Sequence, residues 1–143
     1  MSYTQRFSEE WELIDQIYGV AVAAAAVNDS GLNLLANYVR AVIKIIPLSL
    51  NDALDVDIEQ ATTAAGALST FAAGAKDITV ATTDTAPSLI EIRNEEFSAG
   101  YEYLNIEVTA ANTGGSANYF VVELWGLPVY KPADTTNLDS VTD

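Results

Sequence analysis

The chain of 143 residues lacks both cysteine and histidine. Without cysteine there are no disulfide bonds, no thiolate nucleophile and no cysteine-ligated zinc, and without histidine the commonest general base and metal ligand is missing. Serine and threonine are abundant, but no suitably spaced lysine offers a base that could activate them. The sequence therefore predicts a protein that is not an enzyme and that binds no cofactor.

Basic residues are scarce. Six lysine and arginine residues against twenty acidic residues give a formal net charge of -14. Such a chain repels nucleic-acid phosphates and anionic membrane surfaces, whereas it attracts a protein surface rich in lysine and arginine. The longest nearly uncharged stretch near the start, residues 17–27, is too short for a transmembrane helix and lacks a basic leader region before it. We expect a soluble, unprocessed chain whose partner is a protein, not nucleic acid or a membrane.

A repeated strand pattern is what the chain does contain. Half of its residues are apolar, and about seven short alternating runs are separated by clusters of Gly, Asn, Asp and Pro. Because no helical period is sustained beyond the N-terminus, the pattern favours an antiparallel β-sandwich or a jelly-roll-like fold. We expect one structural domain, with residues 1–37 as an N-terminal arm and first strand, residues 38–133 as the β-sandwich core and residues 134–143 as an acidic tail.

The N-terminal residues have a helical spacing. Ser8 precedes two glutamates and is a candidate N-cap. The spacing predicts a short amphipathic helix or arm, which either packs on its own domain or reaches a neighbouring subunit. In the second case Phe7 and Trp11 are the candidate interface residues. The apolar positions follow one another at steps of four, three and four, and they are Phe7, Trp11, Ile14 and Tyr18.

The next stretches read as strands. Residues 20–33 fit either a helix, because of their alanines, or a buried strand, because of their valines and the turn residues that follow; we favour the strand. Residues 38–50 are more decisive, since two sets of residues alternate there. The first set is Val39, Ala41, Ile43 and Ile45, and the second is Arg40, Val42, Lys44 and Ile46. This alternation predicts a half-buried strand, whose regular pairing we expect to end at Pro47.

Three carboxylates alternate with apolar residues in residues 51–63. A strand period of two places Asp55, Asp57 and Glu59 in one line, opposite Leu54, Val56 and Ile58. Side chains placed two apart on one strand face line a surface, whereas a glycosidase needs two carboxyl groups that face each other across a cleft. Their spacing also differs from that of an EF-hand loop. We expect an acidic stripe that faces solvent or a partner, and no metal site.

Residues 101–126 contain two alternating runs on either side of a pair of glycines. The glycine-containing segment predicts a hairpin turn rather than a phosphate-binding loop. One side of the two runs is apolar and is expected to face the core. The other side is amphipathic, so it is covered either by another part of the same chain or by a second subunit. The candidate interface residues on this second side are Tyr103, Tyr119, Val121 and Trp125.

The order of these motifs resembles a known group of proteins. The motifs are "YVRAVIKIIPLSLNDALDVDIEQATTAAG", "AKDIT", "LIEIRNEEFSAGYEYLNIEVTAAN" and "YFVVELWGLPVYKPAD". Together they cover roughly residues 38–134 and resemble the small decoration, or cement, proteins of tailed bacteriophages. The run from Glu91 to Pro132 is the most specific part of the resemblance.

The resemblance implies a structural virion protein on the outer capsid surface. It implies a β-sandwich or jelly-roll-like domain that bridges subunits of the major capsid protein, commonly as a homotrimer, and it brings no catalytic residues. Two other classes stay open. One is another virion component, such as a tail or neck protein or a receptor-binding knob, and the other is a carbohydrate-binding module that uses exposed aromatic side chains.

Overall fold

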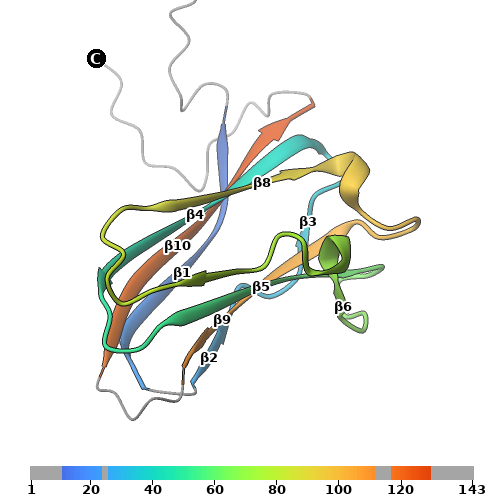
Figure 1. The fold of residues 1–143 in the computed structure, drawn as a ribbon. Coiled ribbons are helices and arrows are strands. Elements are labelled where there is room, and N and C mark those ends of the chain that lie inside the picture. The colour runs from blue at the N-terminus through green and yellow to red at the C-terminus, as the bar shows by residue number, and fades with distance from the viewer. Residues whose placement is uncertain (1–10, 24–25, 112–116, 130–143) are drawn as a thin grey trace, which may run out of the picture.

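The computed structural model describes residues 11–23, 26–111 and 117–129, and it confirms the expected all-β sandwich (Figure 1). Every strand pairing is antiparallel. The strands are β1 (Glu12–Val22), β2 (Val27–Asp29), β3 (Asn33–Leu34), β4 (Tyr38–Ser49), β5 (Leu54–Ala61), β6 (Ser69–Thr70), β7 (Ile78–Val80), β8 (Ser88–Arg93), β9 (Tyr103–Ala110) and β10 (Asn118–Pro128), and the 3-10 helices are η1 (Phe71–Gly74) and η2 (Asn94–Glu96).

The strands form two sheets that lie face to face in Figure 1. The four-stranded sheet has the order β1-β10-β4-β8. The six-stranded sheet has the order β2-β9-β5-β6, with β3 also paired to β9 and β7 also paired to β5. Because β1, β2 and β3 pair with strands from the far end of the chain, residues 12–22 and 27–34 form part of the same sandwich. The proposed division at residue 38 stays a prediction.

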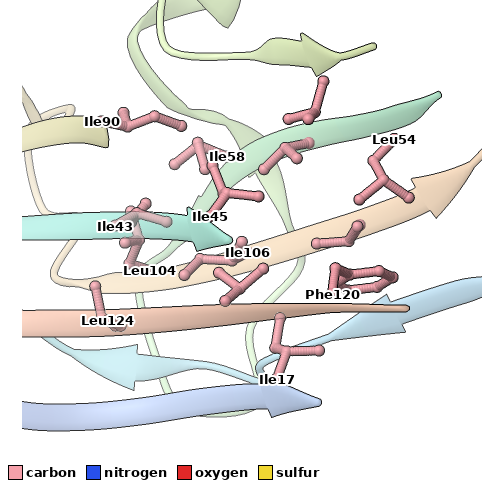
Figure 2. Close-up of a cluster of buried hydrophobic side chains, with 14 of the residues drawn as sticks. Ile17, Ile43, Ile45, Leu54, Ile58, Ile90, Leu104, Ile106, Phe120 and Leu124 are labelled. Atoms are coloured by element: carbon pink, nitrogen blue, oxygen red, sulfur yellow. The ribbon is translucent and has the colours of Figure 1, made fainter. Parts of the chain in front are cut away.

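The core lies between the sheets, and it follows from the strand alternation. Figure 2 shows isoleucine and leucine side chains from both sheets meeting in this space. Ile43 and Ile45 from β4 are fully buried, as are Leu54 and Ile58 from β5. Phe71 of η1 is also fully buried, although the sequence pattern did not mark it as a core residue. Its ring lies edge-on to that of Phe97, with 4.9 Å between the two ring centroids. The alternating runs thus each contribute one apolar face to a shared core.

The expected N-terminal helix is wrong for residues 12–22, which form β1. The residues that β1 buries are Leu13, Ile17, Gly19 and Val22, and they do not match the helical set expected from the sequence. Tyr18, a member of that set, is 63% exposed. Two register shifts interrupt the pairing of β1 with β10, and Ala21 has a φ of 53° beside the second. Phe7 lies outside the described residues.

The regular pairing of β4 with β10 ends at Pro47, as expected from the sequence, because a register shift follows the pair of Pro47 with Phe120. The strand continues to Ser49, and Pro47 lies opposite Phe120 of β10. The pairing of β4 with β8, on its other side, stops at Ile45 opposite Ser88. Proline is therefore accommodated where β4 has a partner on one side only, so that no ladder hydrogen bond from its nitrogen is required.

The expected hairpin between residues 101–110 and 118–126 is also wrong. The two runs form β9 and β10, as expected, and their inner residues are buried, but β9 belongs to the six-stranded sheet and β10 to the four-stranded sheet. The connection between them therefore crosses from one sheet to the other. As a consequence, the outward side chains of β9 and of β10 lie on opposite outer faces of the sandwich.

Asn118 fixes the start of β10 by a buried hydrogen-bond network. Its Oδ1 accepts hydrogen bonds from the backbone N–H groups of Asn51, at 2.8 Å, and Asp52, at 2.9 Å. Its Nδ2 donates to the backbone oxygen of Val22 and to Oδ2 of Asp52, both at 3.1 Å. One fully buried side chain thus joins the end of β1, the turn between β4 and β5, and β10. Buried polar groups in native proteins are paired in this way.

Candidate interaction surfaces

The outer face of the four-stranded sheet is rich in apolar side chains. We call it the apolar face and define it by Tyr18, Val42, Lys44, Ile46, Leu89, Val121, Glu123 and Trp125. Strand register places these residues in rows, because Trp125 lies opposite Val42, Glu123 opposite Lys44, and Lys44 opposite Leu89. Leu89 is 68% exposed and Tyr18 63%. Exposed apolar side chains that gather on one face are a feature of interaction sites.

A hollow of about 310 Å³ lies on the apolar face, and it is lined by Trp11, Val42, Lys44, Leu89, Glu123 and Trp125. The Trp125 indole Nε1–H donates to Oε2 of Glu123 at 2.9 Å, which fixes one wall. Trp11 lies under the guanidinium of Arg40, with 5.2 Å between the guanidinium carbon and the ring centroid. Such a cation–π contact orients both side chains.

The described lysine and arginine side chains gather on the side of the four-stranded sheet. Arg40 and Lys44 lie on β4, and Arg93 at the end of β8 interacts with Glu91 at 3.2 Å. Lys76 Nζ donates to the backbone oxygen of Glu91 on β8 at 2.8 Å and forms an ion pair with Glu96 of η2 at 2.9 Å. The apolar face therefore combines apolar surface with charges of both signs.

The outer face of the six-stranded sheet is acidic. We call it the acidic face and define it by Asp29, Asp55, Asp57, Glu59 and Glu107. Along β5, Leu54, Val56 and Ile58 are buried, and the three carboxylates of the expected stripe alternate with them. The structure adds a row across the strands, because Glu107 of β9 lies opposite both Asp29 of β2 and Asp57 of β5. Among the described residues, none of these carboxylates forms an ion pair.

Repulsion and burial affect the protonation of this row. Burial raises the pKa of Glu107, and the carboxylates of Glu59, Asp57 and Asp29 raise it further. Burial likewise raises the pKa of Asp57, with added contributions from Asp77 and Asp55. Like charges directly opposite one another destabilise a sheet. A cationic partner surface placed over the row would relieve this repulsion.

Two carboxylates of the acidic face are held by hydrogen bonds from neighbouring strands. Asp55 accepts a hydrogen bond from Thr79 Oγ1 at 2.8 Å, and Glu59 accepts one from Asn105 Nδ2 at 2.8 Å. In residues 11–23, 26–111 and 117–129, no three acidic side chains come together as metal ligands. The arrangement can bind cationic groups at several points across a flat sheet.

The candidate interface residues from the sequence are divided between the two faces. Trp125 and Val121 share the apolar face, Trp11 lines its hollow, and Tyr119 is 40% exposed on the same strand as Trp125. Tyr103 lies on β9 of the six-stranded sheet, so it is not part of this group.

Six members of the apolar face were not selected as interface residues from the sequence, and they are Tyr18, Val42, Lys44, Ile46, Leu89 and Glu123. The signal for Leu89 was available, because it alternates with the core residues Ile90 and Ile92. Sequence alternation could not show that Leu89 lies beside Lys44 of the neighbouring strand, at the hollow.

Within the described part of the chain, no helix is long and apolar enough to cross a membrane.

Comparison with known proteins adds little to this geometry. A scan against protein-family models finds no match, and a search of curated proteins finds none. Among solved structures, the chain is similar to one described as "Bacillus endospore appendages form a novel family of disulfide-linked pili", with 12% sequence identity and a TM-score of 0.42 over 90% of this chain and 99% of that chain. A similarity at this level carries no conclusion about the function of this chain.

Proposed function

We propose that this protein is a structural virion protein that decorates the outer surface of a tailed-phage capsid and bridges subunits of the major capsid protein. The observation that carries the proposal is the acidic face, where carboxylates from three neighbouring strands lie in one row. This row of carboxylates suits a broad lysine- and arginine-rich protein surface. The sequence resemblance to decoration proteins supplies the identity of that surface.

The sandwich architecture suits a bridging role. Its core joins both sheets, so force applied to one outer face is passed to the other through packed side chains rather than through loops. A domain that binds across a subunit joint stabilises the closed joint, because its binding free energy is lost when the joint opens. Attachment of several copies, or of several contacts per copy, strengthens this effect.

The experiment compares capsids assembled with and without the chain. Decoration predicts additional density on the outer capsid surface across subunit joints, and capsids that withstand more heat before they release DNA. Density on tails or necks, or a chain absent from purified particles, would contradict the proposal. Raising the salt concentration should promote release, because the Debye length falls from about 10 Å at 0.1 M to about 3 Å at 1 M.

A paired substitution tests whether the acidic face makes the contact. Asp57→Asn together with Glu107→Gln removes two charges from the row and should weaken capsid binding about tenfold or more, since each charged contact at an interface contributes on the order of 1 kcal/mol. The matched control is Glu91→Gln, which removes an exposed charge from the four-stranded sheet and should bind as the original chain does. Equal binding by both variants would place the contact elsewhere.

A carbohydrate-binding module is the second candidate, and the hollow on the apolar face is the observation that favours it. Tryptophan side chains stack on sugar rings, and Trp11 and Trp125 both line this hollow. Binding of the isolated chain to a glycan array, lost on Trp125→Ala, would support this candidate. Binding to capsids with no glycan binding would exclude it.

A further inference from the structure

The two outer faces differ in their ability to meet a second copy of the chain. Each copy has a net charge of -14, so copies repel one another in general. Contact through the acidic face would oppose carboxylates to carboxylates. On the apolar face, Lys44 lies directly beside Glu123, and Arg93 pairs with Glu91, so the local charges balance. The apolar face is therefore where two copies can approach.

We propose that two copies of this chain pair through their apolar faces, related by a two-fold axis that runs parallel to the strands between β4 and β10. The proposal concerns association of the chain with itself, and it stands whether or not the partner of the acidic face is a capsid. Paired in this way, the two copies leave both acidic faces on the outside of the dimer.

The axis follows from strand register. A two-fold rotation about a line between β4 and β10 places β4 of one copy over β10 of the other. Lys44 then lies over Glu123 of the second copy, and Glu123 lies over its Lys44. By the same rotation Val42 is placed over Trp125, and Ile46 over Val121, so apolar residues meet apolar residues. Sheets packed with their strands nearly aligned are a common arrangement.

The contact would cover Leu89 and the hollow beside it. Leu89 is 68% exposed, and the hollow beside it is lined largely by apolar atoms of Val42 and Trp125. Interfaces are enriched in tryptophan and tyrosine at their centres, with charged residues paired toward the rim. The apolar face supplies Trp125 for such a centre, and its Lys44 and Glu123 are paired with each other's counterparts beside the axis.

The three-fold arrangement implied by the sequence resemblance differs from this one. In a ring of three, each contact is heterologous, so the apolar face of one subunit meets a different surface of the next. A two-fold contact instead brings the same face together twice. Mass measurements in solution distinguish the two arrangements directly.

The first experiment measures the mass of the purified full chain by sedimentation across a range of concentrations. We expect a dimer, and Leu89→Glu should weaken dimerisation about tenfold or more because it places a charge in the contact. Leu89 is exposed, so the variant keeps its fold, which circular dichroism verifies. The matched control is Val27→Glu, which changes a 55% exposed valine of the six-stranded sheet and should dimerise as the original chain does. A monomer at micromolar concentration, a trimer, or Leu89→Glu that dimerises as the original would overturn the proposal.

The second experiment tests the axis by exchanging charges. Lys44→Glu alone places two carboxylates together at both contact points, and Glu123→Lys alone places two ammonium groups together, so each variant should dimerise about tenfold more weakly. In an equimolar mixture, each contact point of the mixed dimer again holds opposite charges. We expect the mixture to recover dimerisation. Because the neighbouring charges within each chain are the same alone and mixed, a mixture that dimerises no better than the separate variants would overturn the two-fold pairing.

Discussion

The two sheets of this sandwich have similar inner faces and contrasting outer faces. Inside, β4 presents Ala41, Ile43 and Ile45 and β5 presents Leu54, Val56 and Ile58, and all of these apolar side chains are buried. Outside, β4 lies among apolar and basic side chains, whereas β5 carries a line of carboxylates. The inner faces are constrained by a shared core, and the outer faces are free to differ. The two outer faces thus differ in charge and polarity although the inner faces are alike.

The largest expected effect is the loss of stability caused by a substitution in the shared core, which should affect both sheets at once. Phe120→Ala empties a fully buried site in β10, where the ring packs so closely over Gly19 that a Cβ there would overlap it. Large-to-small changes of this kind cost about 3 to 5 kcal/mol. Urea unfolding should show this loss with the same midpoint by tryptophan fluorescence and by circular dichroism. A loss below about 1 kcal/mol, or two separate midpoints, would show that the faces do not depend on one core.

Asn118→Ala should have the next largest effect on stability. Compared with a matched variant in the other sheet, it should distinguish the contributions of the two sheets. It removes the hydrogen bonds to Asn51, Asp52 and Val22, and it should lower the free energy of unfolding by about 2 to 3 kcal/mol, because buried groups lose their partners. The matched variant is Asn105→Ala, a buried asparagine of the six-stranded sheet that donates to Glu59. We expect it to cost about 1 kcal/mol. Chemical denaturation measures both, and equal losses would contradict the distinction.

The acidic face should show its repulsion in the pH dependence of stability. Because the pKa of Asp57 and that of Glu107 are raised in the folded chain, the folded state holds these protons more tightly than the unfolded state. Their contribution to stability is fully present below the ordinary values of 3.8 and 4.5, and it is lost as the pH rises through the folded pKa values. Asp57→Asn with Glu107→Gln should therefore stabilise the chain at pH 7, by about 0.5 kcal/mol.

On the side of the four-stranded sheet, Glu96 should contribute to stability with the opposite dependence on pH. Burial alone would raise its pKa, but hydrogen bonds from Lys76 and from the Arg93 backbone lower it overall. Its contribution is present above its ordinary pKa of 4.5 and is lost as the pH falls through the folded value. Glu96→Gln should thus destabilise the chain at pH 7, in contrast to the variant of the acidic face. Thermal melts from pH 3 to pH 8 measure both, and the same sign for both variants would refute this assignment.

Arg40→Ala should give the smallest effect, at the rim of the apolar face. It removes the guanidinium above Trp11 and should cost about 0.5 kcal/mol, as exposed cation–π pairs do. The comparison variant is Arg93→Ala, which removes an exposed pair with Glu91 and should cost less. Thermal stability and the emission wavelength of tryptophan report on the two changes. An unchanged emission spectrum in Arg40→Ala would indicate that the contact is absent in solution.

Strand alternation made most of the fold predictable, because it reports which side chains face inward. It identified the inward residues of β4, β5, β9 and β10. It could not identify strand partners, which is why β9 and β10 were expected to pair although they lie in different sheets. Partner choice depends on contacts between residues distant in sequence, and a turn-like segment such as residues 112–117 is compatible with a hairpin or with a crossing between sheets.

The candidate surfaces were predictable in part for the same reason. The acidic stripe on β5 follows from a single strand and was found, whereas the row with Glu107 and Asp29 requires knowing which strands are neighbours. For β1, residues spaced by four, three and four fitted a helix, while bulges shifted the actual strand period. Asn118 gave no signal, since an asparagine beside glycine and serine is usual in a turn.

The bulges in β1 have a consequence for chains held at high local density. Within the described part of the chain, β1 pairs only with β10 and so forms an edge of its sheet. A long, regular edge would offer a template on which neighbouring copies could add strands and grow into fibres. The register shifts after Leu13 and Gly19 interrupt that template, because an incoming straight strand cannot match its hydrogen-bonding groups across both. Irregularity in β1 thus allows many copies to crowd together while each keeps its own fold.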